Sequence, residues 1–180
     1  QKWRKADCKA VNEENYKRII SNPDIKKVLM ASRWPLYLHG YNEKGGAHQV
    51  QPYIVFNEGQ AATEENLEER AKGYTDNIVK TACLLRDNGK TAVFVGAMPE
   101  LLRNVPNALA KSKLVYHRDD RIEIPLDAYE KRNAVVQRAF ARASKECGAR
   151  ILDLRPYLCS DGVCSGVREG RGTFAARDAV

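Results

Sequence analysis

The chain has 180 residues, of which 43% are hydrophobic and 29% charged, and its formal net charge is +7. This composition is typical of a globular domain with a sizeable core and excludes a disordered chain. No apolar run approaches the ~20 residues that span a bilayer, and the polar start Gln1–Asp7 lacks the pattern of a signal peptide. Because the sequence does not begin with Met, we expect a fragment or an excised domain, with any export signal upstream.

Helices and strands are expected to alternate along the chain. In chain order they are a helix over Val11–Ile20, a strand over Lys27–Ala31, an irregular stretch over Ser32–Ala62 with a candidate edge strand at Gln51–Phe56, a helix from its cap Thr63 to Asn88, a strand over Thr91–Gly96, a helix from Asp127 to Glu146 and a strand over Arg150–Leu154. Gly89 and Gly148 end the two long helices, and Asp127 with Glu130 resembles a capping box. Strands joined by helical crossovers predict one domain with a parallel sheet covered by helices.

Chemistry in such a sheet collects at the carboxyl ends of the strands. Arg33 and Trp34 follow the first strand, and a guanidinium beside an indole can grip a sugar, a carboxylate or an oxyanion. The alternative is a Trp that packs the sheet end and an Arg that pairs with a nearby acid. Glu100 follows the second strand and is expected in the first turn of a helix, where its charge complements the helix dipole.

Several familiar sites are missing from the sequence. There is no Gly-rich phosphate loop, no Gly-x-Ser-x-Gly block and no cluster with metal-ligand spacing, so we expect no cofactor and no metal. His39, His48 and His117 are each weak candidates for a general base, and no Ser/His/Asp triad can be assembled from them.

The net charge is interpreted as a soluble basic surface. Lys and Arg are scattered, apart from short clusters at Lys111–Lys113 and His117–Arg118. Attraction to an acidic polymer or a membrane surface is the alternative. Aromatic and basic residues are not interleaved, so we expect no nucleic-acid partner.

Five cysteines are present. Cys159 and Cys164 bracket the turn Ser160–Val163 and can close a small disulfide loop, which indicates an oxidising compartment such as a periplasm; free thiols are the alternative. Cys83 and Cys147 lie on apolar helix faces and are interpreted as buried core. Cys8 is then the odd one, with a partner upstream of this chain.

The ordered set of segments resembles the extracytoplasmic SGNH domain fused to membrane-bound acyltransferases of the acyltransferase-three type. The resemblance covers about residues 8–170, and residues 171–180 form a divergent tail. The matching pieces are Cys8 with the helix through Asn12, the strand Val28–Ala31 running into Arg33 and Trp34, the segment Val93–Glu100, the helix over Leu126–Cys147 and the loop Pro156–Cys164.

The resemblance implies an SGNH-hydrolase-like, flavodoxin-like α/β/α sandwich that is incomplete at both ends. The family's serine block would precede Gln1, so the sheet would lack its first strand and leave an exposed edge and an uncovered apolar face. The family's Asp-x-x-His block is expected near or after Val180. Aligning Phe174 with the family's aromatic residue places Ala176 and Ala179 at the Asp and His positions, and Asp178 receives no catalytic role. The end is truncated, frameshifted or degenerate.

The function that the resemblance implies is O-acylation of cell-envelope glycans such as lipopolysaccharide O-antigen or capsule. An upstream membrane domain would deliver the acyl donor and tether this segment, which does not itself span the membrane, at the periplasmic face. Arg33 stands near the family's oxyanion-hole position. Because the Ser and Asp-x-x-His blocks are missing, no catalytic residue is assigned, and the chain alone is expected to be inactive. A non-catalytic glycan-binding or interaction module of the same fold is the alternative.

Overall fold

The structure is a computed structural model that describes residues 5–39, 66–101, 104–118, 120–168 and 171–172. Its elements are α1 (Lys5–Ser21), β1 (Lys27–Met30), α2 (Trp34–His39), α3 (Leu67–Asp87), β2 (Thr91–Val95), α4 (Val105–Val115), β3 (Glu123–Pro125), α5 (Leu126–Cys147), β4 (Arg150–Leu152), α6 (Arg155–Leu158), β5 (Cys159–Ser160), β6 (Val163–Ser165), β7 (Val167–Arg168) and β8 (Arg171–Gly172). The candidate strand Gln51–Phe56, the cap Thr63, His48, the tail 173–180 and the side chain of Cys8 lie outside the described part.

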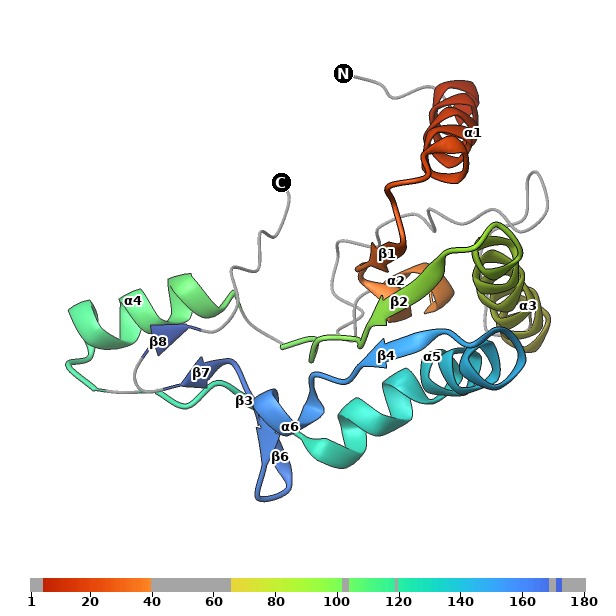
Figure 1. The fold of residues 1–180 in the computed structure, drawn as a ribbon. Coiled ribbons are helices and arrows are strands. Elements are labelled where there is room, and N and C mark those ends of the chain that lie inside the picture. Colours follow the sequence, from red (N-terminus) through yellow and green to blue (C-terminus); the bar gives the residue numbers. More distant parts are fainter. Residues whose placement is uncertain (1–4, 40–65, 102–103, 119, 169–170, 173–180) are drawn as a thin grey trace.

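The main sheet consists of β1, β2 and β4 in that spatial order (Figure 1). Both pairs are parallel: Val28 lies opposite Ala92, and Phe94 lies opposite Ile151. α3 connects toward β2 and α5 leads into β4, as expected for crossover connections in a parallel sheet. The α/β class and the three strands predicted from the apolar runs are therefore confirmed.

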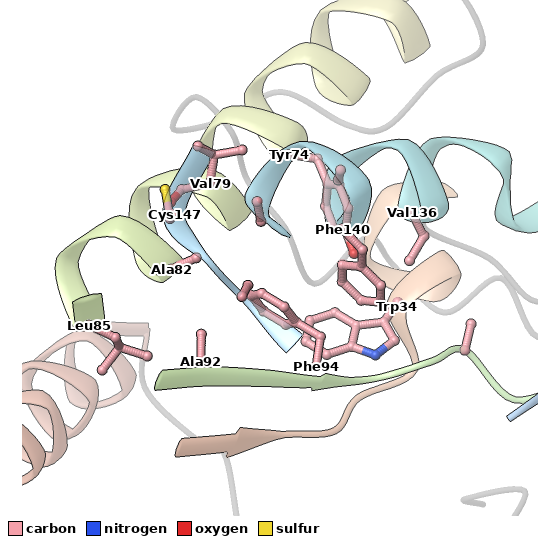
Figure 2. Packing of buried hydrophobic residues seen from close by; sticks show 14 of the residues in the cluster. Trp34, Tyr74, Val79, Ala82, Leu85, Ala92, Phe94, Val136, Phe140 and Cys147 are labelled. Carbon is pink, nitrogen blue, oxygen red and sulfur yellow. The ribbon is translucent and has the colours of Figure 1, made fainter. Parts of the chain in front are cut away.

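The core lies between one face of this sheet and the helices α3 and α5 (Figure 2). Ala92 and Phe94 alternate with half-buried neighbours along β2, so their side chains point to the same face. Phe94 is fully buried and stacks on Phe140 of α5, with 4.8 Å between ring centroids. Burying one such side chain contributes roughly 1.5–3 kcal/mol, so this face organises the fold.

The opposite face of the sheet carries exposed apolar side chains. Leu29 of β1 is 64% exposed and Leu152 of β4 is 46% exposed. They lie opposite Val93 and Val95 of β2, which places all four on the same side. The second helical layer of the expected sandwich is not among the described elements, and the expected uncovered apolar face is present in the described part of the chain.

A second, antiparallel sheet follows the order β3, β6, β5. Cys159 and Cys164 are directly opposite each other in its hairpin and form a disulfide. Asp161 and Gly162 at the turn both have positive φ, the conformation that a tight two-residue hairpin needs and that an Asp-Gly pair favours. The predicted disulfide is confirmed, and the free-thiol alternative is not.

The starts of several helices differ from the prediction. α1 is longer than expected, α2 replaces the first part of the predicted irregular stretch, and α3 begins at Leu67 with Asn66 as its N-cap. The capping box is wrong: Pro125 is the N-cap of α5, and Asp127 already lies in the first turn, where its Oδ1 accepts from the backbone N–H of Ala128. The preceding strand β3 ends at Pro125, which pairs with Val163 of β6. Because Pro125 belongs to this strand pair, the helix begins at the next residue.

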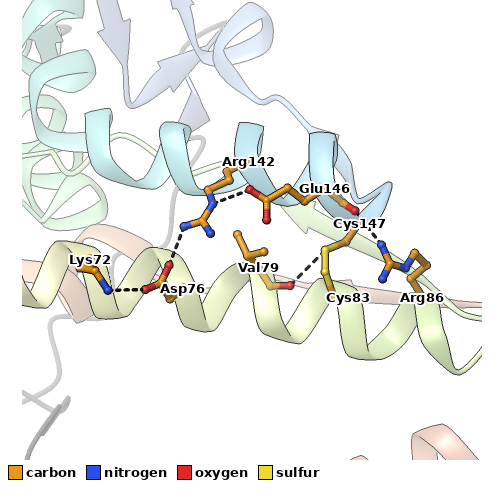
Figure 3. A network of polar contacts seen from close by, with 8 residues as sticks. All are labelled: Lys72, Asp76, Val79, Cys83, Arg86, Arg142, Glu146 and Cys147. Atoms are coloured by element: carbon orange, nitrogen blue, oxygen red, sulfur yellow. Dashed lines mark hydrogen bonds and ion pairs between the residues drawn. A yellow bond between two sulfur atoms is a disulfide. The ribbon is translucent and has the colours of Figure 1, made fainter.

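A disulfide between Cys83 and Cys147 joins α3 to α5 (Figure 3). Their Cα atoms are 4.7 Å apart, so the two helix faces meet at this point. Arg142 also bridges the helices through Asp76, at 2.6 Å on the exposed side. The placement of these two cysteines in the core is confirmed, because Cys147 is buried and the half-buried Cys83 packs against the same cluster. The bond between them was not predicted, because helical periodicity places each on a buried face without showing that the faces meet.

Among the helices that the structure describes, none combines the length and the apolar character that a bilayer crossing requires.

Candidate functional site

The carboxyl ends of β1, β2 and β4 lie at one edge of the main sheet, because the three strands are parallel. Arg33 and Trp34 follow β1, the segment 96–100 follows β2, and Asp153 with Arg155 follows β4. This edge is where ligands bind in open α/β sheets. The side chains that follow these three strands therefore form the candidate site.

Trp34 belongs to the core. Its indole is only 8% exposed and lies edge-on to Phe94 and Phe140, with centroids 5.9 Å and 5.2 Å away (Figure 2). Its Nε1–H donates to the carbonyl of Val95 at 2.8 Å. Trp34 therefore packs the end of the sheet, which was the alternative to gripping a ligand. In this arrangement its indole offers no open ring face to a sugar.

Arg33 stands one residue before this buried indole and is exposed. Its carbonyl accepts from the backbone N–H of Leu36 at 3.0 Å, so its backbone is fixed by the first turn of α2. A guanidinium carried at this point can donate to a carboxylate, a sugar hydroxyl or a developing oxyanion. Arg33 stays the candidate binding residue that the sequence predicted.

The segment after β2 is held from several sides. The N–H of Gly96 donates to Leu152 O at 2.8 Å, and a Cβ on Gly96 would lie 3.1 Å from that same oxygen, so glycine fits this close approach. The hydroxyl of Tyr129 donates to Ala97 O at 2.8 Å, and burial raises the pKa of Tyr129 to about 12. These contacts fix the backbone of the segment, which is what a site built on a strand end requires.

Glu100 ends this segment in a buried ion pair with Arg132 of α5. Nη2 and Nε of Arg132 lie 3.0 Å and 3.1 Å from Oε2 of Glu100, and the two side chains are only 7% and 11% exposed. Oε1 of Glu100 is buried with no hydrogen-bond partner. The predicted helix start at Glu100 is wrong, because α4 begins at Val105 and is capped by the side chain of Asn104.

Arg132 was not predicted to be a buried partner of Glu100, although the sequence carries a signal for it. Arg132 comes three residues after Tyr129 and four before Val136, so it lies on the buried stripe of α5. A cation on an apolar helix face is rarely buried without a partner, and here the partner is Glu100.

The two histidine candidates in the described part of the chain, His39 and His117, lie at or just beyond the ends of different helices. His39 ends α2, and its Nε2 lies 3.2 Å from the carbonyl oxygen of Arg132, so this nitrogen serves a structural contact. His117 is exposed beyond α4 with a positive φ of 49°. No group of three metal-ligating side chains occurs among the residues that the structure describes.

His39 gives the fold a pH dependence. Burial, together with the charge of Arg132, lowers its pKa from 6.5 to about 4. Between these values the unfolded chain binds a proton that the folded chain does not, so stability is fully present above pH 6.5 and falls as the pH drops toward 4. We expect the midpoint of thermal unfolding to fall over this interval.

The His39→Gln variant is the control, because Gln keeps a donor but does not titrate. Its melting curve should be flatter over the same interval. The Arg155 guanidinium lowers the pKa of Asp153 below its ordinary value of 3.8, so that carboxylate loses its contribution at lower pH. Equal pH slopes for wild type and variant would exclude His39 as the source.

A groove with a volume of about 770 Å³ runs between α5 and the edge strand β4. Its lining includes Phe140, Ser144 and Ile151 along its length, and Tyr129 and Arg155. Arg155 donates to both carboxylate oxygens of Asp153, from Nε to Oδ1 at 3.1 Å and from Nη2 to Oδ2 at 2.7 Å. The groove therefore adjoins the carboxyl edge and combines an apolar wall with a charged pair.

Comparison with known proteins gives one family. The model of the SGNH domain (fused to AT3 domains) matches residues 1–179. No curated protein and no solved structure matches the chain. The matched range includes the tail after residue 170, which the sequence resemblance had left out.

Proposed function

The chain belongs to the SGNH domains that are fused to AT3 domains, and from this premise we propose that it is part of an O-acyltransferase that transfers acetyl or other acyl groups to cell-envelope glycans. The observation that carries the proposal is the family match along residues 1–179 together with an exposed Arg33 at the carboxyl edge of the sheet. The position of Arg33 suits a residue that binds substrate oxygens.

Arg33 is assigned a binding role rather than proton transfer. In acyl transfer by a serine, the serine oxygen adds to the acyl carbonyl carbon, and the carbonyl oxygen becomes an oxyanion until the leaving group departs. A guanidinium stays charged throughout and can donate N–H groups to that oxygen. Trp34 takes a positioning role, because its indole donates to the carbonyl of Val95 and so ties the residue after Arg33 to the end of β2.

The proposal includes the partners and the place of action. The acyl group reaches the site from the membrane acyltransferase part, and the acceptor is a hydroxyl of a lipopolysaccharide or capsule sugar on the periplasmic side. The sequence contains neither a Gly-Asp-Ser block nor an Asp-x-x-His block. We therefore propose that these 180 residues alone do not turn over esters.

The test is made in the source organism, with the intact gene. Arg33→Ala should lower the O-acetyl content of the envelope glycans about 100-fold, the effect of removing one oxyanion donor, as measured by NMR of purified polysaccharide. Arg138→Ala, an exposed arginine on α5, is the matched control and should leave acetylation unchanged. Unchanged acetylation after deletion of the coding region would contradict the proposal, and binding of polysaccharide by the chain would then favour the glycan-binding module.

A further inference from the structure

Three consecutive apolar side chains are exposed at the end of α4. Leu114 is 77% exposed, more than any other large hydrophobic side chain in the described part of the chain, and Val115 and Tyr116 are 59% and 50% exposed. α4 lies far from the main sheet in Figure 1. We call residues 111–118 the α4 tip. Large apolar side chains that gather in the open at one place on a surface mark an interaction site, and these three follow one another at the end of a single helix.

The α4 tip is fixed by its own hydrogen bonds. Ser112 is 1% exposed, and its Oγ donates to Arg118 O at 2.6 Å. The backbone N–H groups of Tyr116 and Arg118 both donate to Ser112 O, at 3.1 Å and 3.2 Å. The turn that follows the helix is therefore closed on itself. Because the tip is preformed, a partner need not order it on binding.

Cations surround the apolar side chains. Lys111, Lys113, Arg118 and Arg121 are exposed, and the first three belong to the two short basic clusters of the sequence. The Nζ atom of Lys111 and the Cζ atom of Arg118 lie 5.7 Å and 5.2 Å from the centre of the Tyr116 ring. Asp120 pairs with Arg118 at 2.7 Å and offsets part of this charge.

The size and charge of the α4 tip fit a lipid surface better than a folded protein. A stable protein interface buries ~800 Å² on each partner, which three side chains on a helix end do not supply. Leu and Val can enter the acyl boundary, a tyrosine ring suits the headgroup level, and Lys and Arg extend their charged ends to anionic headgroups. All three kinds of side chain are adjacent here.

We propose that the α4 tip is a membrane-docking surface that inserts shallowly into a leaflet containing anionic phospholipids. The inference goes beyond the proposed function and does not depend on it, because it rests only on exposure, rigidity and charge at this helix end. It would hold this face of the chain against a bilayer independently of any membrane-spanning segment.

The test is co-sedimentation of the 180-residue chain with vesicles. Phosphatidylcholine vesicles that contain phosphatidylglycerol should bind the chain, and vesicles of phosphatidylcholine alone should bind it much more weakly. Leu114→Ser with Tyr116→Ser should weaken binding about tenfold or more, since it removes two inserting side chains. Lys111→Gln should weaken binding to the anionic vesicles about fivefold and remove part of its salt dependence.

The control is Tyr157→Ser, because Tyr157 is 64% exposed on α6, away from the tip, and should not affect binding. A second measurement does not depend on a loss of binding: the emission of a Tyr116→Trp variant should shift to the blue with anionic vesicles, whereas that of Tyr157→Trp should not. Equal binding by wild type and the Leu114/Tyr116 variant would overturn the proposal. Self-association through the tip without vesicle binding would also overturn it and assign the surface to a second copy of the chain.

Discussion

Replacing Arg132 by methionine should lower the free energy of unfolding by about 3–5 kcal/mol, because it leaves the Glu100 carboxylate buried without its cation. Both side chains are nearly inaccessible, at 7% and 11% exposure. Oε2 of Glu100 receives both contacts from Arg132, and Oε1 already lacks a partner. Nothing else among the described contacts of Glu100 can replace the lost charge. Urea unfolding of wild type and variant measures the difference.

The double variant Arg132→Met/Glu100→Leu is the decisive control. Removing both charges together should recover most of the loss, since an apolar pair of similar volume is often as stable as a buried ion pair. Glu100→Leu alone should be destabilising, because it leaves the guanidinium of Arg132 buried. The resulting double-mutant cycle separates this pair from the other contacts of Arg132. An Arg132→Met variant as stable as wild type would show that water reaches the carboxylate.

The sequence predicted the parallel sheet because its strands are short apolar runs separated by long amphipathic helices. Ala92 and Phe94 alternate with Thr91 and Val93, and Gly89 ends the preceding helix two residues before the strand begins. The disulfide of the cysteine hairpin was also predictable, since Cys159 and Cys164 flank an Asp-Gly turn and their pairing is local. These features depend on neighbours within a few residues, which periodicity and turn chemistry describe.

Features that depend on distant residues were missed. α2 has six residues, too few to show a helical period, and the burial of its Trp34 requires Phe94 and Phe140. The ion pair of Arg132 was not predicted, because a single charge on an apolar stripe does not identify its partner. That partner is Glu100, 32 residues earlier in the chain. The α4 tip was visible only as short basic clusters, since exposure of its apolar residues is a property of the fold.

The disulfide between α3 and α5 was also not predicted from the sequence, and removing it should have the second large effect on the free energy of unfolding. The double variant Cys83→Ala/Cys147→Ala should lose about 4 kcal/mol of stability, because the bond closes a loop with a sequence separation of 64 in the unfolded chain. The variant should also unfold with a steeper dependence on urea, since its unfolded chain is more expanded. Wild type measured under reducing conditions should be less stable than this variant, because the reductant also opens the disulfide between Cys159 and Cys164.

The second disulfide supplies a matched control. Cys159→Ala/Cys164→Ala likewise removes one buried and one half-buried sulfur, but its loop has a sequence separation of only 5. The loop-entropy relation gives about 2 kcal/mol for this pair, half the effect of the long loop. Because the packing change is similar in both variants, the difference between them measures loop closure. Equal losses would show that the stabilisation comes from local packing of sulfur. No loss in the Cys83/Cys147 variant would show that the apolar contacts around Val79 and Ala143, together with the Arg142–Asp76 ion pair, hold the helices without the disulfide.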